Sequence, residues 1–362
     1  MPPPMASAWR QGDTTIYNPQ EIFNNLQANW KIPRKDLWVK ALISSGDAGA
    51  VHLAEMNGIN VAAKIMKTKQ KFKTIQEAKA DQAYKDMCLE LAALSALKHH
   101  PNVVSFLGAC VEDPLEPILI QELVDGEDLA KFWARASGAC TAWKPPRHTA
   151  YGWILHLYSG LSHLHSSNPM IIHRDIKPAN LLLANNLSVL KIADFGTAKR
   201  VNAGEKETAM HSGRTSGNVM YMAPEVYSME SGHYDEKCDI YSAALISWRI
   251  ATGKFFPPRT QWPDELWRPS LDVLSWPELG AIIDTAWEQV PQERPSAAQV
   301  VQMLNNLPNK PDIQTLGIAP PPLQAAASCS SVHSMQCPPR GKWGAGNSCP
   351  QCCDPGTLCQ VS

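Results

Sequence analysis

The segment that most constrains this chain lies near its middle: His173-Arg174-Asp175-Ile176-Lys177-Pro178-Ala179-Asn180. A carboxylate at Asp175 can orient a hydroxyl group and accept its proton. The amide oxygen of Asn180, five positions later, can bind Mg²⁺, and Lys177 between them can reach a phosphate. An ordinary charged loop is the alternative interpretation. The complete eight-residue pattern nevertheless favours a site for phosphoryl transfer.

A second acidic position follows at Asp194-Phe195-Gly196, nineteen residues after Asp175. The apolar residues 189–193 predict a strand that ends just before Asp194. A carboxylate at that strand end can bind a Mg²⁺ ion that bridges two phosphates. Alone, this three-residue match would be interpreted as an ordinary turn. Its position after Asp175 and after a predicted strand favours the interpretation as a metal-binding site.

A glycine-containing turn lies near the start of the chain, at Ser44-Ser45-Gly46-Asp47-Ala48-Gly49-Ala50-Val51. Glycines let backbone N–H groups approach phosphate oxygens because no Cβ stands in the way. Alone, this turn would be interpreted as a plain hairpin. It gains weight from Val61-Ala62-Ala63-Lys64, because Lys64 ends a strand-like run and can pair with the phosphates of a nucleotide.

Lys64 needs a carboxylate partner that holds it in place. Glu90 is the best candidate, because it precedes Leu94 and Leu97 on a predicted helical stretch. Glu77 is the second candidate, and a solvent-exposed helix charge is the alternative interpretation of Glu90.

Two further acidic residues are predicted to be buried for structural reasons. Glu225, in Ala223-Pro224-Glu225, needs a buried partner, and Arg294 is the natural one. Asp239 opens an apolar helix and is expected to accept hydrogen bonds from the backbone of the segment around Asp175.

The order of predicted elements divides the chain into a β-rich half and a helical half. In the first half, strands are expected at residues 37–43, 50–55, 59–66, 103–107 and 118–123, with helices at 21–30 and 74–98. In the second half, apolar periodicity predicts helices at 151–165, 239–252 and 297–307. After Pro308 the composition turns to Pro, Ala, Ser, Gly and Cys, which predicts a disordered tail.

The charge and the amino terminus exclude several classes of partner. A formal net charge of −1 gives no basis for binding nucleic acid or an anionic membrane surface. The chain lacks a run of about 18 apolar residues, so no membrane span is expected. Residues 1–10 contain three prolines and no apolar run, which is atypical of a secretory signal. We therefore expect a cytoplasmic location, with the nucleus as the second choice.

With these motifs in this order, residues 36 to 307 resemble a eukaryotic protein kinase domain. The resemblance implies an α+β, bilobal fold, with a small, mostly β N-lobe at 36–125 that has one prominent helix. A larger, mostly α C-lobe would span 126–307, with an extension at 1–35 and the tail at 308–362. It also implies ATP and Mg²⁺ as cofactors and a protein as substrate.

The resemblance further implies a role for each residue of the site. Ile120 to Val124 would be the hinge, where backbone groups of Glu122 and Val124 bind adenine and Gln121 lies at the back of the pocket. The expected catalytic residues are Asp175, Lys177, Lys64 and Glu90, and the expected metal ligands are Asn180 and Asp194. The expected nucleotide-binding residues are Ser44, Gly46, Gly49, Val51, Ala62, Lys64, Gln121, Glu122, Val124 and Leu182.

Lys177-Pro178 is similar to the serine/threonine type of kinase. Trp30-Lys31-Ile32-Pro33 and Phe106-Leu107-Gly108-Ala109-Cys110 resemble the tyrosine-kinase-like group. Three positions depart from the family pattern. Ser44 replaces the first glycine of the loop, Ala244 replaces a helix glycine, and Asn218 replaces a threonine that normally bonds the catalytic Asp and Lys. A dual-specificity or tyrosine kinase therefore stays open, as does a pseudokinase scaffold.

The segment from Asp194 to Glu225 would be the activation loop. Arg174 can pair with a phosphate on this loop, so we expect an upstream kinase to act there and phosphorylation to raise activity. The candidate sites are Thr215, Ser216 and Ser212, and a loop that is never modified is the alternative.

The tail contains a cluster of cysteines, at positions 329, 337, 349, 352, 353 and 359. Cys349-Pro350-Gln351-Cys352 has the spacing of metal ligands, but a second well-spaced pair is missing. A disordered tail, a zinc site and a disulfide or redox role therefore remain alternatives.

Overall fold

The computed structural model describes residues 18–46, 49–67, 71–137, 143–201, 207–208, 219–227, 233–257, 261–262 and 267–312. All of these belong to one compact unit.

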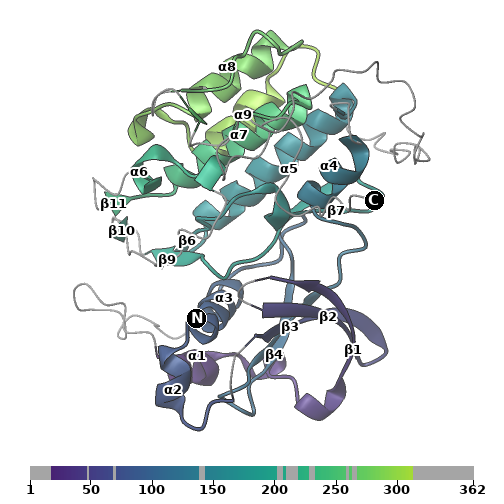
Figure 1. Cartoon of the computed structure of the whole chain (residues 1–362), viewed down its shortest axis with the longest axis vertical. Helices are drawn as coiled ribbons and strands as arrows, with labels where there is room; N and C mark the ends of the chain where they lie inside the picture. The colour runs from purple at the N-terminus through teal and green to yellow at the C-terminus, as the bar shows by residue number, and fades with distance from the viewer. Residues whose placement is uncertain are drawn as a thin grey trace, which may run out of the picture. The chain divides into compact units, whose positions relative to one another are not determined.

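A five-stranded antiparallel sheet forms the core of the first half (Figure 1). Its strands, in spatial order, are β1 (Leu37–Ser45), β2 (Gly49–Met56), β3 (Ile59–Met66), β5 (Ile118–Glu122) and β4 (Phe106–Cys110). Asn57 and Gly58 join β2 to β3 with φ values of 52° and 78°, as a tight hairpin turn requires. The strands predicted at 37–43, 50–55, 59–66 and 118–123 are therefore confirmed.

The strand predicted at 103–107 is wrong, because β4 begins only at Phe106. Val103 and Val104, which precede β4, bond Ile192 and are not part of the sheet. Val103 forms an isolated bridge with Ile192, and the Val104 N–H donates to the Ile192 carbonyl at 2.9 Å. These two valines thus join the β-rich half to the helical half instead of extending the sheet.

The single helix predicted at 74–98 is also wrong. It is divided into α2 (Ile75–Ala80) and α3 (Gln82–Leu94). Asp81 between them is extended, with φ −78° and ψ 134°, and its carboxylate accepts the N–H groups of Ala83 and Tyr84. An aspartate that caps a helix in this way starts a new one, which periodicity alone did not reveal.

The helix predicted at 21–30 is likewise divided. Helix α1 (Pro19–Asn25) ends where Leu26 becomes extended, and a 3₁₀ turn (Ala28–Trp30) follows. A second 3₁₀ turn (Arg34–Asp36) leads into β1.

The second half is mostly helical (Figure 1). Its helices are α4 (Leu129–Ser137), α5 (Arg147–His165), α6 (Pro224–Tyr227), α7 (Lys237–Thr252), α8 (Pro277–Ala286) and α9 (Ala297–Asn305). Helix α7 is buried along most of its length, and α5 packs against it. The three helices predicted in this half are confirmed, and Ala244, which replaces a glycine, lies fully buried inside α7.

Short two-stranded ladders carry the loops that bear the sequence motifs. β7 (Leu181–Ala184) pairs with β8 (Val189–Ile192), β6 (Met170–Ile172) with β9 (Lys199–Val201), and β10 (Glu207–Thr208) with β11 (His233–Tyr234). 3₁₀ turns occur at Pro178–Asn180, Val219–Tyr221 and Pro291–Glu293. Strand β8 ends at Ile192, so Asp194 lies at a strand end, as predicted.

The observed fold is therefore α+β, with a small β-rich lobe and a larger helical lobe, as expected from the resemblance. Among the residues described, no helix is both long enough and apolar enough to cross a membrane.

Candidate active site

Lys64 is the centre of the charged contacts between the two lobes. It lies on β3, is 8% exposed, and its Nζ is 2.6 Å from Glu90 Oε2 and 2.7 Å from Asp194 Oδ1. Burial alone would lower the pKa of Lys64, but these two carboxylates raise it above its ordinary value. Lys64 is therefore a fixed positive charge at neutral pH.

Glu90 is the carboxylate that holds Lys64, and Glu77 is not. Glu90 lies on α3, is 1% exposed, and also accepts the Phe195 N–H at 3.4 Å. Glu77 lies on α2, where its carboxylate accepts the N–H of Lys73. The spacing of Glu90 from Leu94 and Leu97 placed it correctly on the inner side of the helix.

Asp194 carries a carboxylate that is held on one side and accessible on the other. Partial desolvation would raise its pKa, but the attraction of Lys64 lowers it to about 2. Its backbone has φ 64°, which is uncommon for a residue with a side chain. About 47% of the side chain is exposed, so the ionised carboxylate could still bind a cation.

The segment around Asp175 is held together by its own side chains. Lys177 Nζ lies 2.6 Å from Asp175 Oδ2, and Asn180 Nδ2 donates to the same oxygen at 2.9 Å. Asn180 Nδ2 also donates to the Asp175 carbonyl at 2.7 Å. These bonds use the amide nitrogen of Asn180, so its oxygen is the atom that suits a metal ion.

Asp239 holds the backbone of this segment in place, as the sequence predicted. It is 1% exposed and accepts the N–H groups of His173 and Arg174, each at 2.8 Å. The ring Nε2 of His165 lies 3.0 Å from Asp239 Oδ2, the oxygen that also accepts the His173 N–H. Burial would raise the pKa of Asp239, but His165 and the hydrogen bonds lower it, so the carboxylate stays charged.

One backbone hydrogen bond brings the two acidic motifs together. The Ala193 N–H donates to the Asn180 carbonyl at 2.9 Å, and Asp194 is the next residue. Asn180 is also bonded to Asp175, and Asp194 pairs with Lys64. This backbone bond therefore connects the segment of Asp175 to the residue that pairs with Lys64. Direct contacts thus link residues from four distant segments, those that carry Lys64, Glu90, Asp194 and Asp175.

The glycine-containing segment joins β1 to β2: Ser44 and Ser45 end β1, and Gly49 begins β2. Ser44 pairs with Val51, and the Gly46 N–H donates to the Gly49 carbonyl at 3.0 Å. Ser44 does not have a positive φ, so a serine is tolerated there. A Cβ at Gly49 would lie 2.9 Å from the Ile65 carbonyl oxygen, which explains the glycine at this position. Asp47 and Ala48 lie outside the described residues.

The proposed hinge begins at the end of β5. Gln121 is 9% exposed and pairs with Ala62 on one side and Phe106 on the other. Among the residues described, its Nε2 has no hydrogen-bond partner, so a buried donor is available there. Val124, after the strand, is half-buried, and so is Leu182 on β7.

Glu122 has a second role that the sequence analysis missed. Its carboxylate binds Lys191 Nζ at 2.8 and 3.0 Å and accepts the Ser105 N–H at 2.7 Å. Burial would raise its pKa, but these bonds lower it. The side chain of Glu122 therefore ties β5 to β8, which no local sequence signal predicted.

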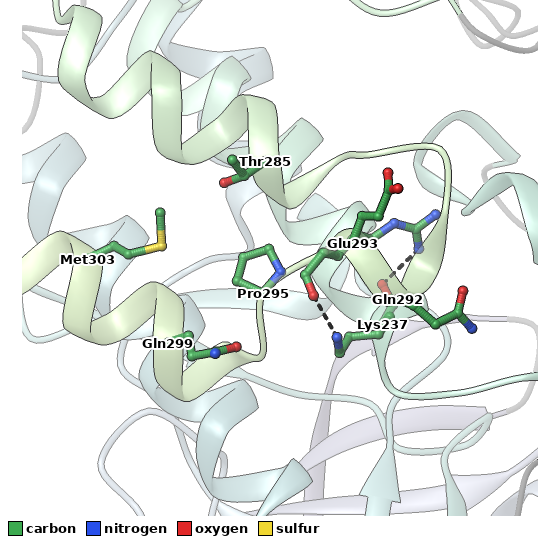
Figure 2. A pocket seen from close by; sticks show the side chains of 8 residues that line it. Lys237, Thr285, Gln292, Glu293, Pro295, Gln299 and Met303 are labelled. Atoms are coloured by element: carbon green, nitrogen blue, oxygen red, sulfur yellow. Dashed lines mark hydrogen bonds between the residues drawn. The ribbon is translucent and has the colours of Figure 1, made fainter.

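The predicted Glu225–Arg294 pair is present. Arg294 is 1% exposed and donates to both carboxylate oxygens of Glu225, at 2.7 and 2.9 Å. Figure 2 shows the neighbouring pocket, of about 370 Å³, where Lys237 Nζ donates to the Arg294 carbonyl at 2.5 Å. None of the expected site residues lines this pocket.

Several predictions fall outside the described residues: Ser212, Thr215, Ser216, Asn218 and the cysteines of the tail. Cys88, Cys110 and Cys238 are buried.

Comparison with known proteins agrees with this arrangement. The profile of the family described as "Protein kinase domain" matches residues 38–304. Mitogen-activated protein kinase kinase kinase 7 of Homo sapiens is 29% identical over 311 residues, which cover 81% of this chain and 44% of the relative. Serine/threonine-protein kinase CTR1 of Arabidopsis thaliana is 31% identical over 297 residues, covering 78% of this chain and 34% of the relative.

A third similar protein is the serine/threonine-protein kinase STY46 of Arabidopsis thaliana. It is 29% identical over 286 residues, which cover 77% of this chain and 45% of the relative. The chain thus spans less than half the length of each of these three relatives.

Proposed function

Because this chain belongs to the protein kinase domain family, we propose that it is an active serine/threonine protein kinase that uses ATP and Mg²⁺. The observation that carries the proposal is the meeting of Lys64, Glu90 and Asp194 beside the Asp175 segment. The names of the similar plant proteins support serine/threonine specificity. The name of the similar mitogen-activated protein kinase kinase kinase 7 supports a role in signalling.

The side chains divide the work of phosphoryl transfer among them. Asp175 orients the acceptor hydroxyl and accepts its proton, and Lys177 offsets negative charge beside it. Lys64 binds phosphate oxygens while Glu90 keeps its ammonium group in place. Asn180 and Asp194 offer oxygen atoms, the ligand type that Mg²⁺ prefers, and the bound ion would neutralise phosphate charge.

The nucleotide-binding role is proposed for the residues that surround Lys64. Gly46 and Gly49 would bring the backbone of the turn beginning at Ser44 close to the phosphates. Apolar contacts with adenine would come from the side chains of Val51, Ala62 and Leu182. The backbones of Glu122 and Val124 would bind the adenine edge, with Gln121 behind it.

A pseudokinase scaffold is the alternative from another class. Such a scaffold would lack one of the groups at the centre, whereas Lys64, Asp175 and Asp194 are all present and close together. Dual or tyrosine specificity depends on the acceptor side, where Asn218 lies outside the described residues.

A peptide-library assay tests the proposed function. The full chain, with ATP and Mg²⁺, would be offered matched peptides whose single acceptor is serine, threonine or tyrosine. We expect transfer to serine and threonine and little to tyrosine. Transfer to tyrosine alone would overturn the specificity. ATP binding without any transfer would favour the scaffold.

We also propose that an upstream kinase acts on the segment between Asp194 and Glu225. Arg174, which precedes Asp175, would pair with the added phosphate, because an arginine carries five N–H donors. Phosphorylation at Ser212, Thr215 or Ser216 should raise activity. Mass spectrometry of the fully active enzyme, before and after phosphatase treatment, measures this. Full activity with all three residues unmodified would contradict it.

The lobe boundaries and the location remain proposals too. We place the N-lobe at 36–125 and the C-lobe at 126–307, and limited proteolysis should cut outside 36–307 first. A cytoplasmic location, with the nucleus second, can be checked with a fluorescent fusion; secretion of the fusion would exclude both.

A further inference from the structure

Tyr234 connects to the segment that carries Asp175 through a side-chain hydrogen bond. Its hydroxyl oxygen accepts a hydrogen bond from Arg174 Nη1 at 2.8 Å, across 60 residues of sequence. The tyrosine is only 8% exposed, so water competes little for this bond. Burial raises the pKa of Tyr234, although Arg174 opposes the rise, so the hydroxyl is neutral at ordinary pH.

Arg174 needs to be held, because its backbone has φ 68°. Its N–H is fixed by Asp239 Oδ1 at 2.8 Å, and its side chain donates to the Thr197 carbonyl through Nε. The bond to Tyr234 is thus the third contact that holds Arg174, and Arg174 directly precedes Asp175 in the chain. Loss of one attachment would let the orientation of Asp175 vary.

The backbone of Tyr234 connects to a different part of the chain. Strand β11, which contains Tyr234, pairs with β10, and the register places Glu207 opposite Tyr234 (Figure 1). β10 belongs to the segment between Asp194 and Glu225. Tyr234 therefore contacts this segment through its backbone and the Asp175 segment through its side chain.

We propose that Tyr234 is a positioning residue: its hydroxyl holds Arg174, and thereby Asp175, in the orientation that phosphoryl transfer needs. Through the β10–β11 pairing it also makes the orientation of Asp175 depend on the placement of residues 207–208. The proposal rests on the proposed kinase activity, and it assigns Tyr234 no contact with ATP or substrate.

Tyr234→Phe tests the proposal because it removes the hydroxyl and keeps the buried ring. The single-turnover transfer rate should fall about tenfold, which corresponds to about 1.4 kcal/mol of transition-state stabilisation. The KM for ATP should stay the same, because Tyr234 touches neither Lys64 nor β5. Tyr151→Phe is the matched control, since that hydroxyl donates to the Leu304 carbonyl in the helical lobe. A rate unchanged in Tyr234→Phe would overturn the proposal.

A double-mutant comparison shows whether the effect passes through Arg174. Adding Tyr234→Phe to Arg174→Gln should produce no further loss if the hydroxyl acts only on the arginine. A full additional tenfold loss would mean that Tyr234 acts by another route, and the proposal would be wrong.

Hydrogen exchange separates this proposal from the proposed function. In Tyr234→Phe, amides of residues 173–177 and 197–201 should exchange faster than in the unmodified chain, while those of α9 should not change. If amide exchange is faster in Tyr234→Phe but the unmodified chain never transfers phosphate, the proposed kinase activity is wrong. The proposed link from Tyr234 through Arg174 to Asp175 would then still hold. If the unmodified chain is an active kinase, and Tyr234→Phe changes neither amide exchange nor the transfer rate, only the proposed link from Tyr234 to Asp175 is wrong.

Discussion

Asp175→Ala should reduce the rate of phosphoryl transfer about a thousandfold, because a positioned general base contributes about 10²- to 10⁴-fold. The structure gives the reason: Lys177 and Asn180 both hold Asp175 Oδ2, so the carboxylate has a defined orientation. Among the residues that the structure describes, no other carboxylate bonds the side chain of Lys177 or Asn180, so none is placed to substitute. Single-turnover transfer from radiolabelled ATP to a protein substrate measures the loss.

Binding of ATP should survive this substitution, because Lys64 and the residues of β5 do not contact Asp175. Asp272→Ala is the matched control, since that aspartate is exposed and its carboxylate accepts a hydrogen bond from the Ser270 hydroxyl. The control should retain full activity. Transfer that stays within a factor of three of the unmodified rate in Asp175→Ala would remove our assignment of this residue.

Lys64→Met should lower the transfer rate by about two to three orders of magnitude, the range found when one preorganised electrostatic group is removed. Methionine keeps much of the length of the side chain but carries no charge. Glu90, 1% exposed, would then be a buried carboxylate without its cation, close to a second carboxylate at Asp194. We therefore also expect weaker ATP binding and a lower melting temperature.

Lys40→Met provides the comparison for this loss. Lys40 also pairs with a glutamate, at 2.5 Å from Glu55, but on the exposed surface of the sheet, where such a pair contributes little. Calorimetry with ATP and a transfer assay on both variants measure the difference. Equal activity of Lys64→Met and Lys40→Met would show that Lys64 does not act on the nucleotide.

Local patterns were sufficient wherever neighbouring residues determine the structure. The Asn57-Gly58 turn, the three strands around it and the apolar helices α5, α7 and α9 all follow from alternation, periodicity and turn residues. The partners Lys64–Glu90 and Glu225–Arg294 were also found, because a buried charge requires an opposite charge and few candidates were available.

The errors occurred where a residue had a choice of partners. Asp81 interrupts the predicted helix because its carboxylate caps α3, and Val104 leaves the predicted strand to bond Ile192. Both alternatives depend on the surroundings of the residue, which a period of apolar residues does not report.

The sequence alone therefore determined which chemical groups this protein has and the local elements that bear them: a loop with Asp175 and Asn180, a strand end with Asp194, a strand with Lys64. Only the tertiary structure decided how they are oriented, through contacts such as Glu122 with Lys191, His165 with Asp239 and Arg174 with Tyr234. The physical reason is range. Turns and periodicity act over a few residues, whereas these contacts join side chains 60 or more positions apart, and their partners are set only when the lobes pack.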